Sequence, residues 1–432
     1  MTIEQLYKVY NQFPSIQTDT RKLKQGDIFF ALSGENFNGN DFALKALETG
    51  ASYAIVDQDL HTSNERVIRV ENVLNALQEL AKYHRKQFDI PFIAITGSNG
   101  KTTTKELVNA VLSSHYVTYT TRGNLNNHIG IPITLLGVSS DAEMAVIEMG
   151  ANHQKEIESY CEYTLPTHGI ITNCGKAHLE GFGGIEGVKK GKGELFDYLR
   201  KNSGTAFIFN DYDYLQEMSA GITTVIEYGT LAGDVSGKAL SSEPFLEVDI
   251  SGDIGIIKTH LVGSYNLPNV LCAVAVGQHF KVPAGIIKIA LENYIPSNSR
   301  SQMVEAGSNK IILDAYNANP TSTKAAIENL VKINAHHKVL MLGGMMELGE
   351  ESLHEHQNII DLVKDYRWDA VVLVGGDYKY VSHSYHYFNT VEEAKEWYQK
   401  QTFEDTYFLI KGSRSIKMET ILEAGLADVK SD

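Results

Sequence analysis

Cysteine is scarce in this sequence, whose three cysteines, Cys161, Cys174 and Cys272, lie far apart along the chain. Such spacing favours neither a disulfide framework nor a zinc site built from paired thiolates. The first residues also lack a basic leader followed by an apolar core, and no run of about eighteen apolar residues occurs. We therefore expect a protein of the reducing cytoplasm that has no membrane span.

Basic residues are in the minority as well. The chain has 38 lysines and arginines against 53 aspartates and glutamates, which gives a formal net charge of -15 at pH 7. Nucleic acids and anionic membrane surfaces normally select a basic face, so this balance argues against either partner. Any phosphorylated ligand must instead meet a local positive patch.

The remaining composition is that of a globular protein, with 43% hydrophobic residues in a 432-residue chain, a length that suits about three domains. Short apolar runs and helical stretches alternate over residues 1–88, which predicts a small N-terminal α/β domain. Residues 89–297 begin with the buried run IAIT and later show short alternating runs, which predict a central, mostly parallel sheet of the P-loop ATPase type with an antiparallel addition. In residues 298–432 strand and helix alternate four times, and this pattern predicts a Rossmann-like, doubly wound α/β domain.

A glycine loop follows the first strand of the central domain. The stretch IAITGSNGKTTT passes through Gly97 and Gly100 into Lys101 and Thr102, where a helix is predicted to begin. Backbone N–H groups and the positive helix end favour an anion there, and phosphate is the natural guest. In the usual G-x-x-x-x-G-K-[ST] loop the lysine reaches the outer phosphates and the hydroxyl ligates Mg²⁺. Ile95 replaces the first glycine of that motif, so the match is to a shorter G-x-x-G-K-T loop.

Two further side chains follow strands of the central domain. Glu148 ends the apolar strand AVIEM, and His178 follows the next predicted strand in GKAHLEGFGG. The carboxyl ends of parallel strands are where ligands gather in open α/β sheets. Either residue alone more often caps a helix or forms a hydrogen bond, but beside a phosphate loop both are candidate magnesium ligands.

A lysine interrupts an apolar helical stripe in GIEGVKKGKGELFDYL. Ile185, Val188, Lys192, Leu195 and Leu199 are spaced by three or four residues and therefore share one helical face. In one interpretation the lysine extends along the stripe to reach water. In the other it points into the site, where it meets phosphate or carries a modification. A carbamate formed with CO₂ would replace its positive charge by an anionic oxygen ligand.

The third domain offers charged residues at two predicted strand ends. Asp314 ends KIIL and opens the turn DAYNANPTS, where it would bind a ribose or a metal-bound phosphate, or cap the next helix. Lys411 and Arg414 follow the last strand in LIKGSRS; they suit a carboxylate or phosphate, or else form a solvated basic turn. Arg300, in the linker SNSRSQ, would reach a nucleotide when the domains close.

A pair of histidines in HEHQ falls on a predicted helix of the same domain. His354 and His356 are two residues apart and point to different sides of that helix. We therefore predict two surface residues rather than a metal-binding pair.

Together these motifs resemble the Mur ligases, the ATP-dependent amide-forming enzymes of peptidoglycan synthesis. The resemblance covers essentially the whole chain and begins with the loop TGSNGKTTTKE. Further segments are similar to the family member that adds D-alanyl-D-alanine: GNLNNHIGIPITLL, EMGANHQKEI, TNCGKAHLEGFGGIEGVKKGKGELF, DAYNANPTS, MELGEES and LIKGSRSIKME. The resemblance implies an N-terminal domain for the UDP end of the substrate, a central ATPase domain and a C-terminal domain that closes over both.

The implied activity is ATP-dependent ligation of D-alanyl-D-alanine to a UDP-N-acetylmuramoyl-tripeptide through an acyl phosphate, with Mg²⁺ as cofactor. We expect a cytoplasmic monomer. Whether the tripeptide ends in lysine or diaminopimelate stays open. Two alternatives are retained: a sister ligase that adds a single amino acid or glutamates to a folate, and a non-catalytic nucleotide-binding module.

The resemblance also implies roles for individual residues. Four would be catalytic, Lys101, Glu148, His178 and Lys192, and the last stands where the family carries a carbamylated lysine. Magnesium would be held by Thr102, Glu148, His178 and Lys192. The nucleotide would contact Gly97, Ser98, Asn99, Gly100, Lys101, Thr102, Thr103, Asn266, Asn269, Arg300 and Asp314. The other substrates would contact Thr20, Arg21, Asn124, Asn126, Asn127, Asn317, Lys411 and Arg414.

Overall fold

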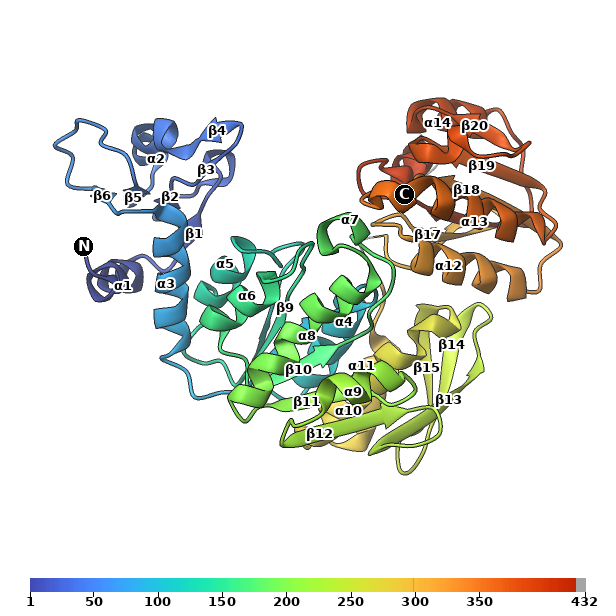
Figure 1. The fold of residues 1–432 in the computed structure, drawn as a ribbon, viewed down its shortest axis with the longest axis horizontal. Helices are drawn as coiled ribbons and strands as arrows, with labels where there is room; N and C mark the ends of the chain where they lie inside the picture. The colour runs from blue at the N-terminus through green and yellow to red at the C-terminus, as the bar shows by residue number, and fades with distance from the viewer. Residues whose placement is uncertain (298, 425–432) are drawn as a thin grey trace.

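The computed structural model describes residues 1–297 and 299–424, so the linker residue 298 and the last part of the predicted third domain, 425–432, lie outside the described residues. Three α/β domains follow one another along the chain, and the central one lies between the other two (Figure 1). The predicted fold class is confirmed.

The N-terminal domain is built on four parallel strands in the order β1-β2-β5-β6. Their bounds are β1 Ile16–Gln17, β2 Ile28–Phe30, β5 Tyr53–Val56 and β6 Val67–Arg69, and a small hairpin pairs β3 Ser33–Gly34 with β4 Phe37–Asn38. The helices are α1 Ile3–Gln12, α2 Ala43–Thr49 and α3 Val73–Arg85. Helix α3 packs against α5 and α6 of the central domain, so it joins the first two domains (Figure 1).

The central domain has nine strands in the order β15-β14-β13-β12-β11-β10-β7-β9-β8. Their bounds are β7 Phe92–Thr96, β8 Thr118–Thr120, β9 Met144–Glu148, β10 His168–Ile171, β11 Thr205–Phe209, β12 Thr224–Gly229, β13 Val235–Ser241, β14 Phe245–Ile250 and β15 Gly255–Val262. The pairs β13–β14 and β14–β15 are antiparallel, whereas the other pairs are parallel. Strand β7, which contains IAIT, is buried at every position, as expected of a strand covered on both faces.

Helices surround this sheet in two groups. Their bounds are α4 Lys101–Ser113, α5 Gly130–Leu136, α6 Glu156–Thr164, α7 Leu179–Phe182, α8 Ile185–Lys201, α9 Asp213–Ser219, α10 Leu267–His279 and α11 Ala284–Asn293. Helices α4, α10 and α11 pack together, and α6 packs against α5 and α8. Helix α10 is apolar nearly all round, which is typical of a helix enclosed by protein, and it contacts α4, α11 and the strands β11 to β14.

The C-terminal domain is a six-stranded sheet in the order β16-β17-β21-β18-β19-β20. The strands are β16 Gln302–Ala306, β17 Asn309–Asp314, β18 His337–Gly343, β19 Ala370–Val374, β20 His386–Phe388 and β21 Thr406–Lys411, and the helices are α12 Pro320–Lys332, α13 Ser352–Lys364 and α14 Val391–Gln399. Only the edge pair β16–β17 is antiparallel among the described pairs of this sheet. Asn319 caps α12 reciprocally with Ser322, and Pro320 occupies the first turn, where it needs no hydrogen-bond partner.

Short 3-10 turns complete the chain: η1 Thr20–Lys22, η2 Gly39–Phe42, η3 Ser264–Asn266, η4 Gly349–Glu351, η5 Gly376–Tyr380 and η6 Met418–Ala424. Helix α3 ends at Arg85 before β7 begins at Phe92, and α11 ends at Asn293 before β16 begins at Gln302. The predicted boundaries after residues 88 and 297 fall in these connections and stay predictions. Among the described residues, no helix has both the length and the apolar character that a membrane span requires.

The surface prediction for the histidine pair on α13 is correct for His354 and wrong for His356. His354 is exposed, whereas His356 is fully buried with its ring edge-on to Tyr378. The His356 Nε2 accepts the N–H of Met345 at 3.1 Å, and its Nδ1 lies 2.7 Å from the carbonyl oxygen of Ser352. Two residues along a helix point to different sides, and here the inner side faces Met345 and Tyr378, so burial lowers the pKa of His356.

Candidate active site

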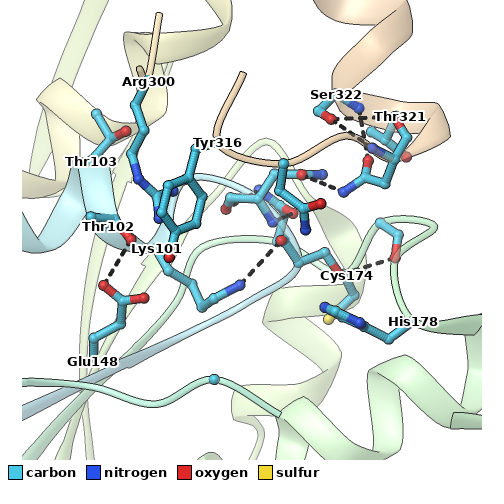
Figure 2. Close-up of a pocket in the computed structure, with 18 of the residues that line it drawn as sticks. Lys101, Thr102, Thr103, Glu148, Cys174, His178, Arg300, Tyr316, Thr321 and Ser322 are labelled. Carbon is cyan, nitrogen blue, oxygen red and sulfur yellow. Dashed lines mark hydrogen bonds between the residues drawn. The ribbon is translucent and has the colours of Figure 1, made fainter. Parts of the chain in front are cut away.

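A cavity of about 740 Å³ opens at the carboxyl ends of the central parallel strands, between the central and C-terminal domains. Figure 2 shows how side chains from both domains point into it. The predicted residues that line it are Ser98, Asn99, Gly100, Lys101, Thr102, Thr103, Asn126, Asn127, Glu148, His178, Asn266, Asn269, Arg300, Asp314, Asn317 and Lys411. The sheet therefore brings together most of the residues that the sequence analysis selected.

The glycine loop has the backbone that an anion site requires. Gly97 and Gly100 have φ values of +142° and +80°, a region that L-residues with side chains rarely adopt. A Cβ on Gly97 would lie 2.0 Å from the Thr172 hydroxyl, so the loop also needs glycine for space. Helix α4 begins directly after Gly100 without a side-chain cap, which leaves its first N–H groups free for an anion.

Lys101 folds back over this loop. Its Nζ donates to the carbonyl oxygens of Gly97 at 2.7 Å and Ser98 at 3.2 Å. Burial lowers the pKa of Lys101 to about 8, with Arg300 adding to the decrease and Glu148 opposing it. Within the described chain no carboxylate forms an ion pair with Lys101, so an incoming phosphate would be its first full counter-charge.

Glu148 is a buried carboxylate whose two oxygens are oriented by different elements. The Thr102 hydroxyl donates to Oε2 at 2.8 Å, and the Asn126 amide donates to Oε1 at 2.8 Å. Figure 2 shows the first of these bonds. Gly150 gives Asn126 room to approach, because a Cβ there would lie 3.0 Å from the Asn126 amide. The result is an adjacent hydroxyl and carboxylate, the oxygen donors that Mg²⁺ prefers.

In Figure 2, His178 and Glu148 are drawn at opposite sides of the cavity. It has a positive φ of 52° just before α7, and its Nδ1 lies 2.5 Å from Oε2 of Glu347 in the C-terminal domain. The nearby His178 lowers the pKa of Glu347. Among the described residues, no group of three or more histidines, cysteines, aspartates or glutamates is arranged to hold a metal.

Lys192 is buried within the protein, and the interpretation that it extends to water is wrong. Its exposed fraction is 1%, its Nζ donates to the Ala151 carbonyl at 3.0 Å, and it lies 4.9 Å from the Phe182 ring. Val188, Leu195 and Leu199 of the same stripe are buried too, whereas Ile185 at the helix start is exposed. Burial lowers the pKa of Lys192 to about 7, with a further decrease from the nearby Lys101.

On the C-terminal side, the two cations predicted after the last strand are paired within their own domain. Lys411 is 2% exposed, and its Nζ lies 2.6 Å from Oδ2 of Asp314 while also donating to the Asn317 carbonyl at 3.0 Å. Arg414 is largely exposed and pairs with Glu419 at 2.6 Å. Of the two, Lys411 lines the cavity, and Arg414 does not.

Arg300 differs from both. Its guanidinium lies 3.5 Å from the centre of the Tyr316 ring, and the described residues provide it with no carboxylate partner. Figure 2 shows this pair among the side chains that line the cavity. A flat, charged group held against an aromatic face is well placed for a nucleotide.

Asn266 and Asn269 fix the start of α10 to α4. Asn269 accepts the Thr104 hydroxyl at 3.0 Å and donates to the Asn266 side-chain oxygen at 2.8 Å, and Asn266 donates to the Val262 carbonyl at 2.9 Å. Both are buried and line the cavity. They thus position the phosphate loop as well as the cavity wall.

Some predicted residues lie elsewhere. Thr20 and Arg21 form part of η1 in the N-terminal domain, and Arg21 is 87% exposed and pairs with Asp19 at 2.8 Å. Asn124 is exposed on the loop before α5. These residues, together with Gly97 and Lys192, do not line the cavity.

The sequence analysis missed several cavity residues in the turn between β17 and α12. Tyr316 stacks on Arg300, and the Asn319 amide donates to the Asn99 side-chain oxygen at 2.7 Å, across the two domains. The turn was recognised from its asparagines and proline, but a contact between residues 220 positions apart leaves no periodic signal. The other cavity residues that were not selected include Asn173, Tyr212, Tyr214, Thr321 and Ser322.

Comparison with known proteins identifies the class. Three family descriptions match in succession: Mur ligase family, catalytic domain, over residues 12–85; Mur ligase middle domain over 95–277; and Mur ligase, glutamate ligase domain, over 299–414. The chain belongs to the Mur ligase family.

Within the family, the similar proteins share one name. UDP-N-acetylmuramoyl-tripeptide--D-alanyl-D-alanine ligase of Bacillus subtilis is 33% identical over 425 residues, covering 94% of this chain and 92% of the relative. The ligase of the same name from Escherichia coli is 34% identical over 430 residues, with coverages of 95% and 93%. The crystal structure of MurF from Acinetobacter baumannii superposes with a TM-score of 0.87 at 30% identity, covering 99% of this chain and 98% of that one.

Proposed function

We propose that this chain is a UDP-N-acetylmuramoyl-tripeptide:D-alanyl-D-alanine ligase that uses ATP to form the new amide bond. One observation carries the chemistry: Lys101, which has no carboxylate partner among the described residues, shares a cavity with the Thr102–Glu148 pair and with Arg300 of the next domain. The substrates are inferred from the full-length similarity to ligases of that name. The proposed setting is peptidoglycan precursor synthesis by a cytoplasmic monomer.

ATP would bind with its phosphates at the loop between β7 and α4. Lys101 would exchange its two carbonyl acceptors for phosphate oxygens, which gives its half-buried ammonium group a counter-charge. Arg300 and Asp314 would contact the nucleotide from the C-terminal domain, and Asn266 and Asn269 would form the base of its pocket. The other loop contacts are those of Ser98, Asn99, Gly100, Thr102 and Thr103.

The donor set near Glu148 fits a magnesium ion. Thr102 and Glu148 present oxygen atoms at hydrogen-bonding distance from each other, and both face the cavity. His178 would join them only after leaving Glu347. When bound, Mg²⁺ neutralises negative charge on the phosphates.

The environment of Lys192 favours a carbamate. A pKa near 7 leaves a large fraction of the amine neutral at physiological pH, and the neutral amine is the form that attacks CO₂. The new N–C bond forms as one amine proton is lost, and the product is an anion close to Lys101. This exchange would remove the repulsion between Lys192 and Lys101.

The reaction follows from the poor reactivity of a carboxylate toward an amine. An oxygen of the tripeptide carboxylate attacks the γ-phosphorus of ATP, the bond to ADP breaks, and an acyl phosphate forms. The amine of D-alanyl-D-alanine then attacks the acyl carbon, and phosphate leaves from the tetrahedral intermediate after the amine has lost its proton to solvent. Lys101 and Arg300 act by position and charge, because phosphoryl transfer needs little else from a protein.

The UDP end of the substrate would bind the N-terminal domain at Thr20 and Arg21, and the peptide would pass Asn124, Asn126 and Asn127 toward the cavity. Asn127 lines the cavity, and Asn126 already uses its amide to hold Glu148. On the C-terminal side Asn317 would contact the incoming dipeptide. Lys411 and Arg414 would contact the substrate while they remain paired with Asp314 and Glu419.

Phosphate release tests the proposal. Purified protein would be given ATP, Mg²⁺, a UDP-muramyl tripeptide and each amine of a panel that includes D-alanyl-D-alanine, single amino acids and glutamate. We expect release that depends on both the tripeptide and D-alanyl-D-alanine. Release with a single amino acid would favour a sister ligase, and a folded protein that releases no phosphate under any combination would favour a nucleotide-binding module without catalysis.

A further inference from the structure

The loop from Gly175 to Glu180, which carries His178, contacts the C-terminal domain along its length. Lys176 Nζ lies 2.6 Å from Oε1 of Glu355 on α13, and the Lys176 backbone N–H donates to the Thr321 hydroxyl at 3.2 Å. His178 lies 2.5 Å from Glu347 of the same domain. Helix α7 also packs on η4, where a Cβ added to Gly349 would lie 3.2 Å from the side chain of Glu180.

The two partners of the Lys176–Glu355 pair differ in burial. The Glu355 side chain is 5% exposed, whereas that of Lys176 is 49% exposed. Lys176 is the cation paired with Glu355 in the described part of the chain, and it comes from the other domain. A buried carboxylate that loses its cation is strongly destabilised, unless water can reach it.

Without Lys176, contact between the two domains would bury the Glu355 carboxylate with no cation, whereas separation of the domains would expose it to water. Lys176 therefore favours the arrangement in which the two domains are in contact, which we term the closed arrangement. The exposed pair Lys364–Asp361, on the same helix α13, has no such effect, because both partners belong to one domain.

We propose that Lys176 is a positioning residue, which through Glu355 holds the C-terminal domain against the loop that carries His178. This inference rests on the proposed function, because closure completes the cavity in which Arg300 faces Lys101. Lys176 does not line that cavity and touches no reacting group. Its effect on the reaction therefore passes through the population of closed molecules.

A population effect has a distinct kinetic signature. Ligands that bind the closed arrangement appear weaker by the fraction of molecules that are closed, and saturating ligand restores closure. The variant Lys176→Ala should therefore raise the KM for ATP about tenfold while kcat stays within about twofold of the parent value. A variant with merely impaired folding would instead lose kcat at unchanged KM.

The experiment combines steady-state phosphate release with small-angle X-ray scattering of the ligand-free protein. Lys176→Ala and Glu355→Gln should each raise the KM for ATP and enlarge the radius of gyration, whereas the control Lys364→Ala should change neither. Lys176→Arg should keep the parent values, and the charge exchange Lys176→Glu with Glu355→Lys should recover most of the lost affinity.

An unchanged KM and radius of gyration in Lys176→Ala would overturn the inference, and so would a loss of kcat alone. Failure of the proposed function is distinguishable, since the parent protein would then release no phosphate while the scattering comparison would still report closure.

Discussion

The cations on the two sides of the cavity have different partners. In the central domain Lys101 and Lys192 donate to backbone carbonyls, and burial lowers both pKa values, to about 8 and about 7. On the C-terminal side Lys411 and Arg414 pair with Asp314 and Glu419 at 2.6 Å. Among these four cations of the described chain, the two without a carboxylate partner therefore belong to the central domain, and Arg300 is a further unpaired cation that lines the cavity from the C-terminal side.

This difference separates cations that await a ligand from cations that hold the protein together. A buried ammonium without a counter-ion costs folding free energy, and a protein retains such a group where a ligand or a modification later satisfies it. A cation that already has its carboxylate gains little from a further anion. The sequence analysis predicted catalytic roles for Lys101 and Lys192 and substrate contacts for Lys411 and Arg414, and it did not predict which of the four have carboxylate partners.

The largest expected effect is on catalysis, at Lys101. Lys101→Ala should lower kcat/KM about a thousandfold, because a charge directed at the transferring phosphoryl group is lost. Phosphate release measured over substrate concentrations from below to above KM gives the loss. The thermal midpoint should not fall, since the variant removes a half-buried cation that lacks a carboxylate partner among the described residues. A Lys101→Ala variant with the activity of the parent protein would contradict the assignment of Lys101 as a ligand-binding cation.

Lys411 should behave in the opposite way, as a residue of stability. Lys411→Ala leaves Asp314 without its cation in a mostly buried position, and we expect a loss of about 3 kcal/mol in the unfolding free energy. Chemical denaturation monitored by fluorescence of the C-terminal tryptophans, Trp368 and Trp397, would detect it. Unchanged stability would mean that Lys411 is as free for ligand as Lys101.

The pH dependence of stability tests whether Lys192 is a buried lysine without a carboxylate partner. Its pKa is about 7 in the folded protein and near 10.4 in an unfolded chain, so between these values the unfolded state binds more protons. Stability should therefore rise with pH across this window, by at most about 1.4 kcal/mol per pH unit.

The measurement is the thermal midpoint at pH 7 to 9 in bicarbonate-free buffer, compared with Lys192→Met. The thermal midpoint of the parent protein should increase relative to that of the variant as pH rises. Below about pH 7 the difference should level off, because Lys192 is then protonated in both states. Parallel curves across the range would contradict the assignment of Lys192 as a buried, unpaired amine.

The smallest effect should come from Arg414. Its guanidinium is 63% exposed, and an ion pair at such a position contributes little in water. Arg414→Ala should change the unfolding free energy by less than about 1 kcal/mol. A larger loss in the same denaturation experiment would place Arg414 with Lys411 as a structural cation.

The features that could be predicted from the sequence are local ones. The glycine loop, the strand ends at Glu148 and Asp314, and the strand–helix alternation of the C-terminal domain all depend on neighbouring residues and their periodicity. The stripe around Lys192 was also correct, but periodicity could not choose between the two directions for its amine. That choice depends on Phe182 and Ala151, which other segments bring close.

Features that depend on distant partners escaped the sequence analysis. Lys411 meets an aspartate 97 positions earlier, and His178 meets Glu347 from another domain. His356 was predicted on the surface because nothing in a helical pattern states which side packs on the sheet. Pairing and burial are set by tertiary contacts. These contacts determine whether a charged residue binds a ligand or stabilises the fold.

The central claim is that the carboxylate of the tripeptide is activated by phosphoryl transfer at the loop that holds Lys101. It is tested most directly with a tripeptide substrate whose terminal carboxylate carries ¹⁸O, incubated with ATP, Mg²⁺ and D-alanyl-D-alanine. The account predicts that the released phosphate contains ¹⁸O, since the oxygen that attacks phosphorus leaves with it. Amide product accompanied by unlabelled phosphate would contradict the account.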